Sequence, residues 1–430
     1  MAIPLTFLWL FLLLTAIGMP IVFGLGIAPL VGFVLADKPV FLKLLPQRLF
    51  LGINQFPLLA IPLFLLAGEI MNVGGITQAL VRFASSLVGH LRGGLAQVNI
   101  LSSILFAGLS GSAVADTSAL GSMLIPAMEK DGYSRRFATA VTAASSVIGP
   151  IIPPSIIMVV YGLVMNVSIA ALFAAGLIPG LVMGVGLMVC TSLIARRRSF
   201  PKAERMAPPR EILTSFRHAF LPLMTPVIIL GGILSGVFTP TEAAGAAVAY
   251  ALLISFVVTR SMQLRDLPQI LLRTGISAAT ILLVVGTATV FGGIVTLSGF
   301  PNKLAQFVFG ITDNPYLLLL LVNLLLLVVG MLLDASPAIL ILGPVLAPTM
   351  VQLGVDPLHF AIIMCVNLTV GLVTPPAGLV LFVASSLTGL QILSIAREMA
   401  PFLVVHILTI FLVTYFPAVA LTIPRLLGFA

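Results

Sequence analysis

Charged side chains are scarce in this sequence. Only 8% of its 430 residues are Asp, Glu, Lys or Arg, whereas 60% are hydrophobic, and the mean hydropathy is +1.22. The longest polar segment, residues 196–217, is too short to fold as a soluble domain. Basic loops on one side of a lipid bilayer explain the net charge of +8, so nucleic acid is not expected as a partner. The composition predicts an all-α polytopic membrane protein.

Residues suited to catalysis or to metal binding are also few. The two cysteines, Cys190 and Cys365, lie in separate apolar segments, and the four histidines show no metal-ligand spacing. Motifs typical of ATPases, zinc proteases and serine hydrolases are missing. Ser110 and Ser112 beside Asp116 suggest an intramembrane protease, but no His or Lys base lies nearby. We therefore expect neither an enzyme nor an organic cofactor.

Two similar breaks in apolar segments indicate an internal repeat. Each break holds small and hydroxyl residues around a single acid, Asp116 in the first and Asp334 in the second, 218 positions apart. Further along, the pairs Pro153–Pro154 and Pro375–Pro376 are 222 positions apart. Preserved order with small changes in spacing is typical of a duplicated unit, here of about 220 residues.

The breaks predict two re-entrant hairpins, at about 95–127 and about 316–348. Too few residues separate their apolar arms for a solvent loop, and irregular backbone inside a bilayer is tolerated only where it lines a cavity or binds something. The Pro-Pro pairs interrupt the following spans, at about 137–164 and about 360–384. Because proline removes a backbone donor and clashes with the preceding turn, we expect these helices to be unwound in the middle.

Each half is expected to cross the membrane five times, beginning with an N-terminal helix that is retained rather than cleaved. Because five is odd, the second copy is inverted relative to the first. The first repeat is expected at 1–195, with a loop at 37–50 and an interfacial arm helix at 76–92. A basic cytoplasmic loop follows at 196–217. The second repeat is expected at 218–430, with a basic interfacial stretch at 260–273 and a separate span at 275–297.

The distribution of positive charge agrees with the inverted arrangement. With the 196–217 loop in the cytoplasm, 16 of the 21 Lys and Arg residues fall on the cytoplasmic side. The few that remain outside are Lys38, Lys43, Arg48, Lys303 and Arg425. Both termini are then expected outside, with the two hairpins entering from opposite faces.

Four acids lie within apolar segments, and Asp116 and Asp334 are the strongest candidates for a site. Each lies at a hairpin break, where one carboxylate, nearby hydroxyls and unwound carbonyls supply the oxygens that a hard cation such as sodium prefers. Alternatively, the two acids only cap half-helices by accepting backbone N–H groups. Glu69 and Glu242, which have no broken helix in the same segment, are expected to serve helix packing or subunit contact.

Several segments resemble the large membrane subunit of the TRAP transporters, the tripartite ATP-independent periplasmic transporters. The segments that carry the resemblance are Leu65–Asn72, Gly89–Ala96, Leu105–Asp116, Ala143–Ser155, Gly236–Ala244 and Thr374–Gly378. They extend along most of the chain and occur in the family's order.

The resemblance implies sodium-driven uptake of an organic acid, such as a C4-dicarboxylate, sialic acid or sugar acid. It implies an elevator mechanism, in which the hairpins and broken helices slide against a scaffold, in a bacterial or archaeal cytoplasmic membrane. It also implies two partners, a small four-helix membrane subunit and a periplasmic substrate-binding protein. Two other interpretations stay open, a sodium–carboxylate symporter that needs no binding protein and a passive channel.

The resemblance implies at least two sodium sites and a substrate site between the hairpin tips. The first sodium site is expected at Ser110, Gly111, Ser112, Asp116, Gly149, Pro150 and Pro153. The second is expected at Gly330, Asp334, Ser336, Thr374, Pro375, Pro376 and Ala377. The substrate is expected at Ser112, Thr117, Pro154, Ser155, Ala335, Pro337 and Gly378. An anionic substrate needs positive potential, which half-helix N-termini and bound sodium supply where Lys and Arg are absent.

The topology can be tested by cysteine labelling. Cysteines placed at Lys43 and Lys303 are expected to react with impermeant thiol reagents in sealed cells, because the charge distribution places both outside. A cysteine at Arg198 is expected to react only after the cells are opened. Labelling of the Arg198 position in sealed cells would contradict the inverted arrangement.

Overall fold

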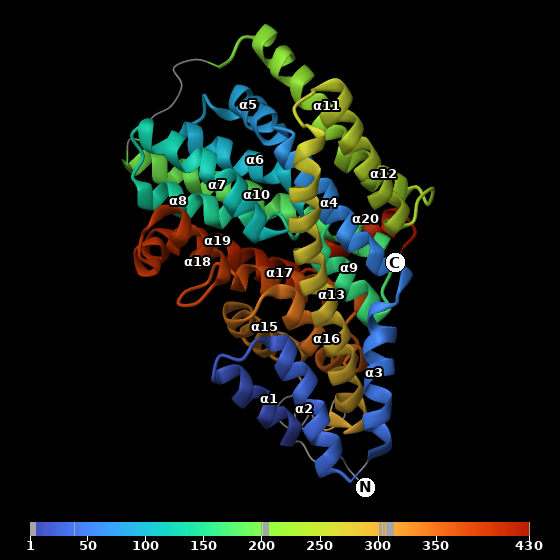
Figure 1. The fold of residues 1–430 in the computed structure, drawn as a ribbon. Helices are drawn as coiled ribbons and strands as arrows, with labels where there is room; N and C mark the ends of the chain where they lie inside the picture. Colours follow the sequence, from blue (N-terminus) through green and yellow to red (C-terminus); the bar gives the residue numbers. More distant parts are fainter. Residues whose placement is uncertain are drawn as a thin grey trace.

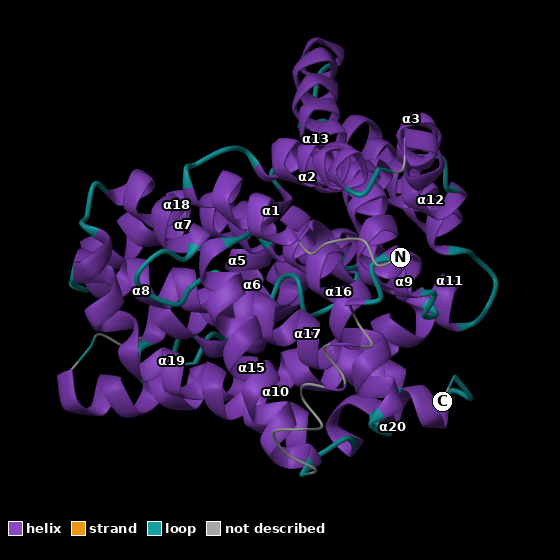
Figure 2. Ribbon diagram, turned by 90° about the horizontal axis from the view of Figure 1, so that it is seen from below, coloured by secondary structure: helices purple, strands orange, loops and turns teal. Residues whose placement is uncertain are grey.

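The computed structural model describes residues 6–37, 39–198, 200, 206–300, 303, 306 and 314–429. Within these ranges the secondary structure is helical, and Figure 2 shows helices joined by loops with no strand drawn. This agrees with the composition, because in a lipid environment a helix satisfies its backbone groups within one segment. Of the predicted basic loop at 196–217, residue 199 and residues 201–205 lie outside the described part.

The helices of the first half follow the predicted order. They are α1 (Thr6–Ala16), α2 (Ile21–Leu35), α3 (Pro39–Ile53), the short η1 (Phe56–Leu59), α4 (Ala60–Val73), α5 (Ile76–Val88), α6 (Gly94–Ser110), α7 (Ala113–Lys130), α8 (Arg135–Ser146), α9 (Ile156–Met165) and α10 (Ile169–Arg198). The pair α6 and α7 occupies the residues for which the sequence predicts a hairpin. The pair α8 and α9 is the first broken helix.

The second half contains the same sequence of a hairpin, a broken helix and a long helix. Its helices are α11 (Pro209–Leu234), α12 (Pro240–Leu253) with a π-turn at Ile254–Val258, η3 (Leu264–Asp266), α13 (Leu267–Leu297), α15 (Pro315–Leu332), α16 (Ala335–Gln352), α17 (Pro357–Gly371), α18 (Leu379–Thr388), α19 (Ile392–Tyr415) and α20 (Ala418–Leu426). Here α15 and α16 form the hairpin, and α17 and α18 form the broken helix.

One long helix, α13, runs beside much of the molecule in Figure 1, and α2, α3, α4 and α16 pack against it. The predicted division of this region into a basic stretch at 260–273 and a separate span at 275–297 is wrong. A single helix of 31 residues begins at Leu267 and includes Arg273. No Gly-Pro or Pro-Pro pair interrupts these residues, so the basic side chain at position 273 does not end the helix.

The predicted loop at 37–50 is also wrong, because Pro39–Ile53 forms α3. In this segment Leu42, Leu45 and Leu49 recur at helical spacing. Leu45 is buried, and Leu42 and Leu49 pack on the hydrophobic core. Tertiary burial on α13 therefore outweighs the polar residues of this segment.

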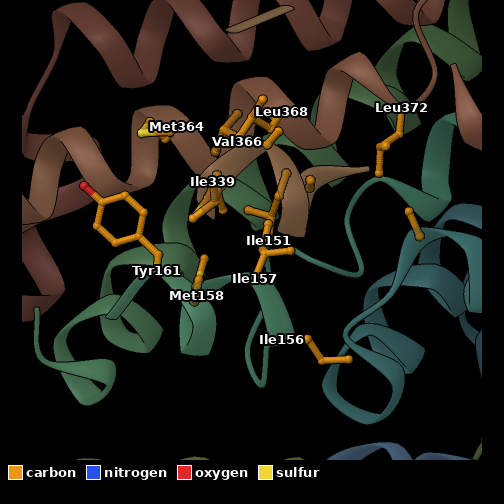
Figure 3. Close-up of a cluster of buried hydrophobic side chains, with 14 of the residues drawn as sticks. Ile151, Ile156, Ile157, Met158, Tyr161, Ile339, Met364, Val366, Leu368 and Leu372 are labelled. Atoms are coloured by element: carbon orange, nitrogen blue, oxygen red, sulfur yellow. The ribbon is translucent and has the colours of Figure 1, made fainter. Parts of the chain in front are cut away.

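The two halves share one core between their broken helices. Figure 3 shows Ile151 and Ile157 of the first broken helix close to Ile339 of α16, with Leu368 of α17 nearby. These four side chains are at most 5% exposed and belong to one hydrophobic cluster. Hairpins and broken helices of both repeats therefore contribute to one hydrophobic core, which also includes residues of α1, α2 and α13.

Seven helices in the described part of the chain are long and apolar enough to cross a membrane. They include the helix around Phe56–Val73, both members of the α11–α12 pair and α13. The structure thus confirms a helical membrane protein with several apolar spans. The inversion of the second repeat and the number of ten crossings stay predictions.

Candidate functional site

The first hairpin turns sharply between α6 and α7. Gly111 adopts a left-handed conformation with φ +60°, and a Cβ there would lie 2.7 Å from the carbonyl oxygen of Pro154. Only glycine combines this backbone with so close an approach to the broken helix. Ser112 then caps α7 by accepting the backbone N–H of Ala115 at 3.4 Å. The hairpin tip is therefore fixed directly against the unwound segment.

Asp116 is fully buried in the first turn of α7, with 0% exposure. One of its carboxylate oxygens accepts a hydrogen bond from the Ser110 hydroxyl. The other oxygen, Oδ2, has no hydrogen-bond partner among the described residues. It lies against Gly149, at a place that a Cβ would fill. A buried carboxylate oxygen without a partner is costly unless a cation or a proton compensates it.

The capping alternative fits the two acids differently, since Asp334 interacts with the backbone N–H of Ala335 at the start of α16. Ser112, not Asp116, accepts the capping N–H of α7. Asp334 occupies the N-cap position of α16, but its side chain makes no capping hydrogen bond. The capping alternative also describes Glu242, whose carboxylate accepts the Thr239 N–H at 2.8 Å in a capping box at the start of α12.

The first broken helix is buried throughout its unwound part, and side chains replace the missing helical hydrogen bonds. Ser155 donates to the carbonyl of Pro150 at 2.5 Å and accepts the N–H of Met158, so it closes the break. Thr117 of the hairpin donates to Ser146 at 2.8 Å, at the end of α8. The Pro153–Pro154 peptide bond is cis.

The second hairpin approaches its broken helix through glycine. A Cβ on Gly371 of α17 would lie 2.5 Å from the carbonyl carbon of Gly330 in α15, so the two backbones touch. Beyond this contact, the N–H of Val380 donates to the carbonyl of Leu372 at 3.0 Å across the break. Thr374 donates to the carbonyl of Val370, and the Pro375–Pro376 peptide bond is cis.

Buried amides brace each hairpin on its broken helix. Asn99 of α6 donates to Thr142 of α8 at 2.6 Å and accepts a hydrogen bond from Ser145. In the second half, Asn323 of α15 accepts a hydrogen bond from Asn367 of α17 at 2.9 Å. Because these groups are desolvated, separating a hairpin from its broken helix leaves unpaired amides.

A cavity of about 70 Å³ lies between the two hairpin tips. Its polar wall combines Ser112 at the start of α7 with Asp334 and Ser336 at the start of α16. The N-terminal ends of two half-helices therefore border one small space, where their dipoles favour an anion and the Asp334 carboxylate favours a cation. At this volume the cavity has room for an ion and about one water molecule, so a larger organic anion would require the hairpin tips to move apart.

The cavity contains some of the residues that the sequence predicts and leaves out others. Those lining it are Gly111, Ser112, Pro150, Asp334, Ala335 and Ser336. Asp116, Thr117, Gly149 and Ser155 lie behind it, in the contact between hairpin and broken helix. Other expected residues do not line it, and these are Ser110, Pro153, Pro154, Gly330, Pro337, Thr374, Pro375, Pro376, Ala377 and Gly378. Of these, Pro337 is buried in α16 and Pro376 is exposed.

Sequence reasoning missed the apolar part of the wall. Ile156, Ile157 and Leu372 come from the broken helices, and Ile281 comes from α13. The first three lie next to the predicted breaks, so their proximity to the Pro-Pro pairs could have indicated that they line the cavity. Nothing in the pattern of α13 distinguishes Ile281 from its apolar neighbours.

The family described as "Tripartite ATP-independent periplasmic transporter, DctM component" matches residues 7–419. The chain belongs to this DctM family. It is a permease component of a TRAP transporter and a multi-pass membrane protein, as the resemblance predicted. It is 43% identical to the sialic acid TRAP transporter large permease protein SiaM of Vibrio cholerae, over 97% of each chain. It is 41% identical to the C4-dicarboxylate TRAP transporter large permease protein DctM of Pseudomonas aeruginosa, over 92% of each chain.

Two solved structures share the fold of this DctM-family permease at low sequence identity. The YdaH transporter of Alcanivorax borkumensis aligns with a TM-score of 0.64 and 18% identity, over 96% of this chain and 98% of YdaH. MtrF of Neisseria gonorrhoeae aligns with a TM-score of 0.54 and 12% identity, over 89% and 85% of the two chains. These likenesses support the helical architecture alone.

The contact between Asp116 and Gly149 predicts that a methyl group added at position 149 destabilises the protein. Gly149→Ala is expected to displace the carboxylate and to lower the free energy of unfolding by about 1–3 kcal/mol, because the added Cβ overlaps Oδ2. Thermal unfolding of the purified permease measures this. Gly231→Ala is the control, since a Cβ at Gly231 meets nothing within 4 Å. Equal stability of the two variants would contradict the contact.

Proposed function

We propose that this permease takes up a small organic acid by coupling its entry to sodium. The acid is a carboxylate such as sialic acid or a C4-dicarboxylate, delivered by a periplasmic binding protein. The hairpins and broken helices move as one body against the remaining helices, as an elevator. In this arrangement the protein lies in the bacterial cytoplasmic membrane with both termini outside.

One observation carries the sodium part of the proposal, the buried Asp116 carboxylate with an unpartnered oxygen. Sodium is a cargo ion here, and Asp116, the Ser110 hydroxyl and carbonyls near Gly149 are the oxygens that would hold it. A second ion would bind near Asp334, which occupies the N-cap position of α16 as Ser112 does in α7. Each bound ion offsets a carboxylate and raises the positive potential at the hairpin tips.

The names of the relatives support an anionic substrate. One relative is a sialic acid permease, another is a C4-dicarboxylate permease, and a third, DctMQ of Oleidesulfovibrio alaskensis, is an isethionate permease. All three substrates are small organic anions. The helix N-termini at the central cavity suit such a charge.

The partners are a small four-helix membrane subunit and the binding protein. This chain matches 64% of the length of the DctMQ permease, over which the two are 38% identical. The remaining third of DctMQ is long enough for a small membrane subunit fused to the large one. We infer that the present chain works with a separate subunit of that kind.

A symporter without a binding protein and a passive channel are the alternatives. Uptake of sialic acid and of succinate into proteoliposomes separates the three, measured with and without a sodium gradient and with and without the binding protein. Uptake that needs both supports the proposal. Gradient-driven uptake without the binding protein supports the simple symporter, and equilibration without any gradient supports the channel.

The acids can be tested by removing charge while keeping shape. Asp116→Asn and Asp334→Asn are each expected to raise the half-saturating sodium concentration at least about tenfold, because a hydrogen bond or contact to a charged group is worth about 1.5–3 kcal/mol. Asp131→Asn, in the exposed turn after α7, is the control. Unchanged sodium dependence in both variants would remove the acids from the ion sites.

The elevator predicts which distances change. Between sodium-free and sodium- and substrate-loaded states, the distance from Ser112 to Ala247 of α12 is expected to change, whereas Ser112 to Pro153 is expected to stay constant. The reason is that the hairpin tip packs on the broken helix and moves with it. Spin-label pairs at these positions measure both distances. A constant first distance with a changing second one would favour a local gate.

A further inference from the structure

A second cavity, much larger than the central one, lies between α3, α13 and α16. Its volume is about 870 Å³, and we name it the α3 vestibule. Figure 1 shows α3 and the C-terminal part of α13 side by side below the level of the central helices, with α16 behind them. The charge distribution of the sequence places this end of the molecule outside the cell.

Arg48 is the one charged residue among those lining the α3 vestibule. Its guanidinium lies on Gly293 of α13, at a place that a Cβ on Gly293 would fill. The residue is half-buried, and among the described residues it forms neither an ion pair nor a hydrogen bond. The other polar lining groups, Gln55, Thr289 and Thr296, are uncharged. The vestibule thus holds one uncompensated positive charge.

A related cavity on the opposite half has a different charge balance. Its volume is about 710 Å³, and it contains Arg273, from α13, together with Glu69 of α4. Arg48 and Arg273 are 225 positions apart, close to the spacing of 222 between the two Pro-Pro pairs. The repeat therefore supplies an arginine to each cavity. Only the arginine of the α3 vestibule shares its cavity with no acid.

The α3 vestibule and the central cavity are both lined by residues of α16. Leu340, Pro344 and Pro348 of α16 form part of the vestibule wall, whereas Ala335 at the start of α16 lines the central cavity. From Ala335 to Leu340 is five residues, or about 8 Å along the helix axis. A small anion held in the vestibule is therefore close to the tip of the second hairpin.

We propose that Arg48 is an anion-binding residue that receives the carboxylate substrate in the α3 vestibule before it enters between the hairpin tips. The inference rests on the proposed function for the identity of the anion. A guanidinium pairs with a carboxylate through two parallel hydrogen bonds, and Gly293 leaves room for its planar head. Arg48 sits on the scaffold side, so it meets the substrate without travelling with the hairpins.

The first arm of the test measures the vestibule without any transport. A cysteine at Gln55, an exposed lining residue just beyond the end of α3, is treated with sulfonatoethyl and trimethylammonioethyl methanethiosulfonate, which are anionic and cationic. Arg48→Gln is expected to lower the anionic-to-cationic ratio of reaction rates about fivefold, because it removes one nearby unit charge that solvent screens only in part. Protein with only the native Cys190 and Cys365 gives the background.

Two further variants make this arm specific. Lys43→Gln removes a charge from an exposed position of the same helix and is expected to leave the ratio unchanged. Gly293→Ala retains the arginine but fills its place, and is expected to lower the ratio even if Arg48→Gln fails to fold. A ratio that Arg48→Gln and Gly293→Ala both leave at its starting value would overturn the site.

The second arm measures uptake of sialic acid and of succinate with the binding protein and a sodium gradient. Arg48→Gln is expected to raise the half-saturating substrate concentration about tenfold, with the maximal rate and the sodium dependence unchanged, and Arg48→Lys is expected to restore part of the loss. Loss of sodium dependence instead would point to a structural role. A variant effect that depends on phosphatidylglycerol content would assign Arg48 to lipid.

The two arms separate this inference from the function on which it rests. If the wild-type permease takes up neither acid, the proposed function fails, while the reagent ratio still decides whether Arg48 makes an anion site. If the wild type transports and the Arg48 variants match it in both arms, the inference fails alone.

Discussion

The packing of the Asp116 carboxylate against Gly149 is the constraint on which the site depends. The acid comes from a hairpin and the glycine from an unwound helix, so neither element can be placed without the other. Ser110 satisfies one oxygen, and the second faces the break. Irregular backbone is tolerated inside a membrane where its unpaired groups line a site. Here the Asp116 carboxylate adjoins backbone carbonyl oxygens that lack helical partners, an arrangement of oxygens that a cation prefers.

Around this contact the hairpins and broken helices are tied by buried polar groups rather than by exposed loops. Thr117 is hydrogen-bonded to Ser146, Asn99 to Thr142 and Asn323 to Asn367, and each bond links a hairpin to its broken helix. Desolvated hydrogen bonds are costly to leave unmade, which favours movement of these elements together over separation. Two of the remaining helices are also hydrogen-bonded to these elements, because Gln97 of α6 donates to the carbonyl of Met188 in α10 and a ring nitrogen of His406 in α19 lies 3.2 Å from the carbonyl oxygen of Ala144. In contrast, α13 borders the central cavity through the apolar Ile281.

The sequence alone was sufficient for much of this arrangement. Asp116, Asp334 and the two Pro-Pro pairs mark the breaks, because a buried charge is costly in an apolar helix and a proline interrupts its hydrogen bonds. The helix at Pro39–Ile53 was missed, since burial on α13 overrides its charged residues, and single-residue patterns do not report a neighbour that is distant in sequence. Of the apolar wall of the cavity, Ile281 was missed for the same reason. Which apolar residue faces a cavity is decided by tertiary packing.

The contact between Gly330 and Gly371 has a consequence for how the second hairpin can open. Two backbones that touch have no side chains between them, so there is no rotamer to change and no partial loosening by side-chain motion. The contact is lost only when a whole helix moves away. Opening at this point therefore requires displacement of the backbone of α15 or α17, and no change of side-chain conformation alone can achieve it.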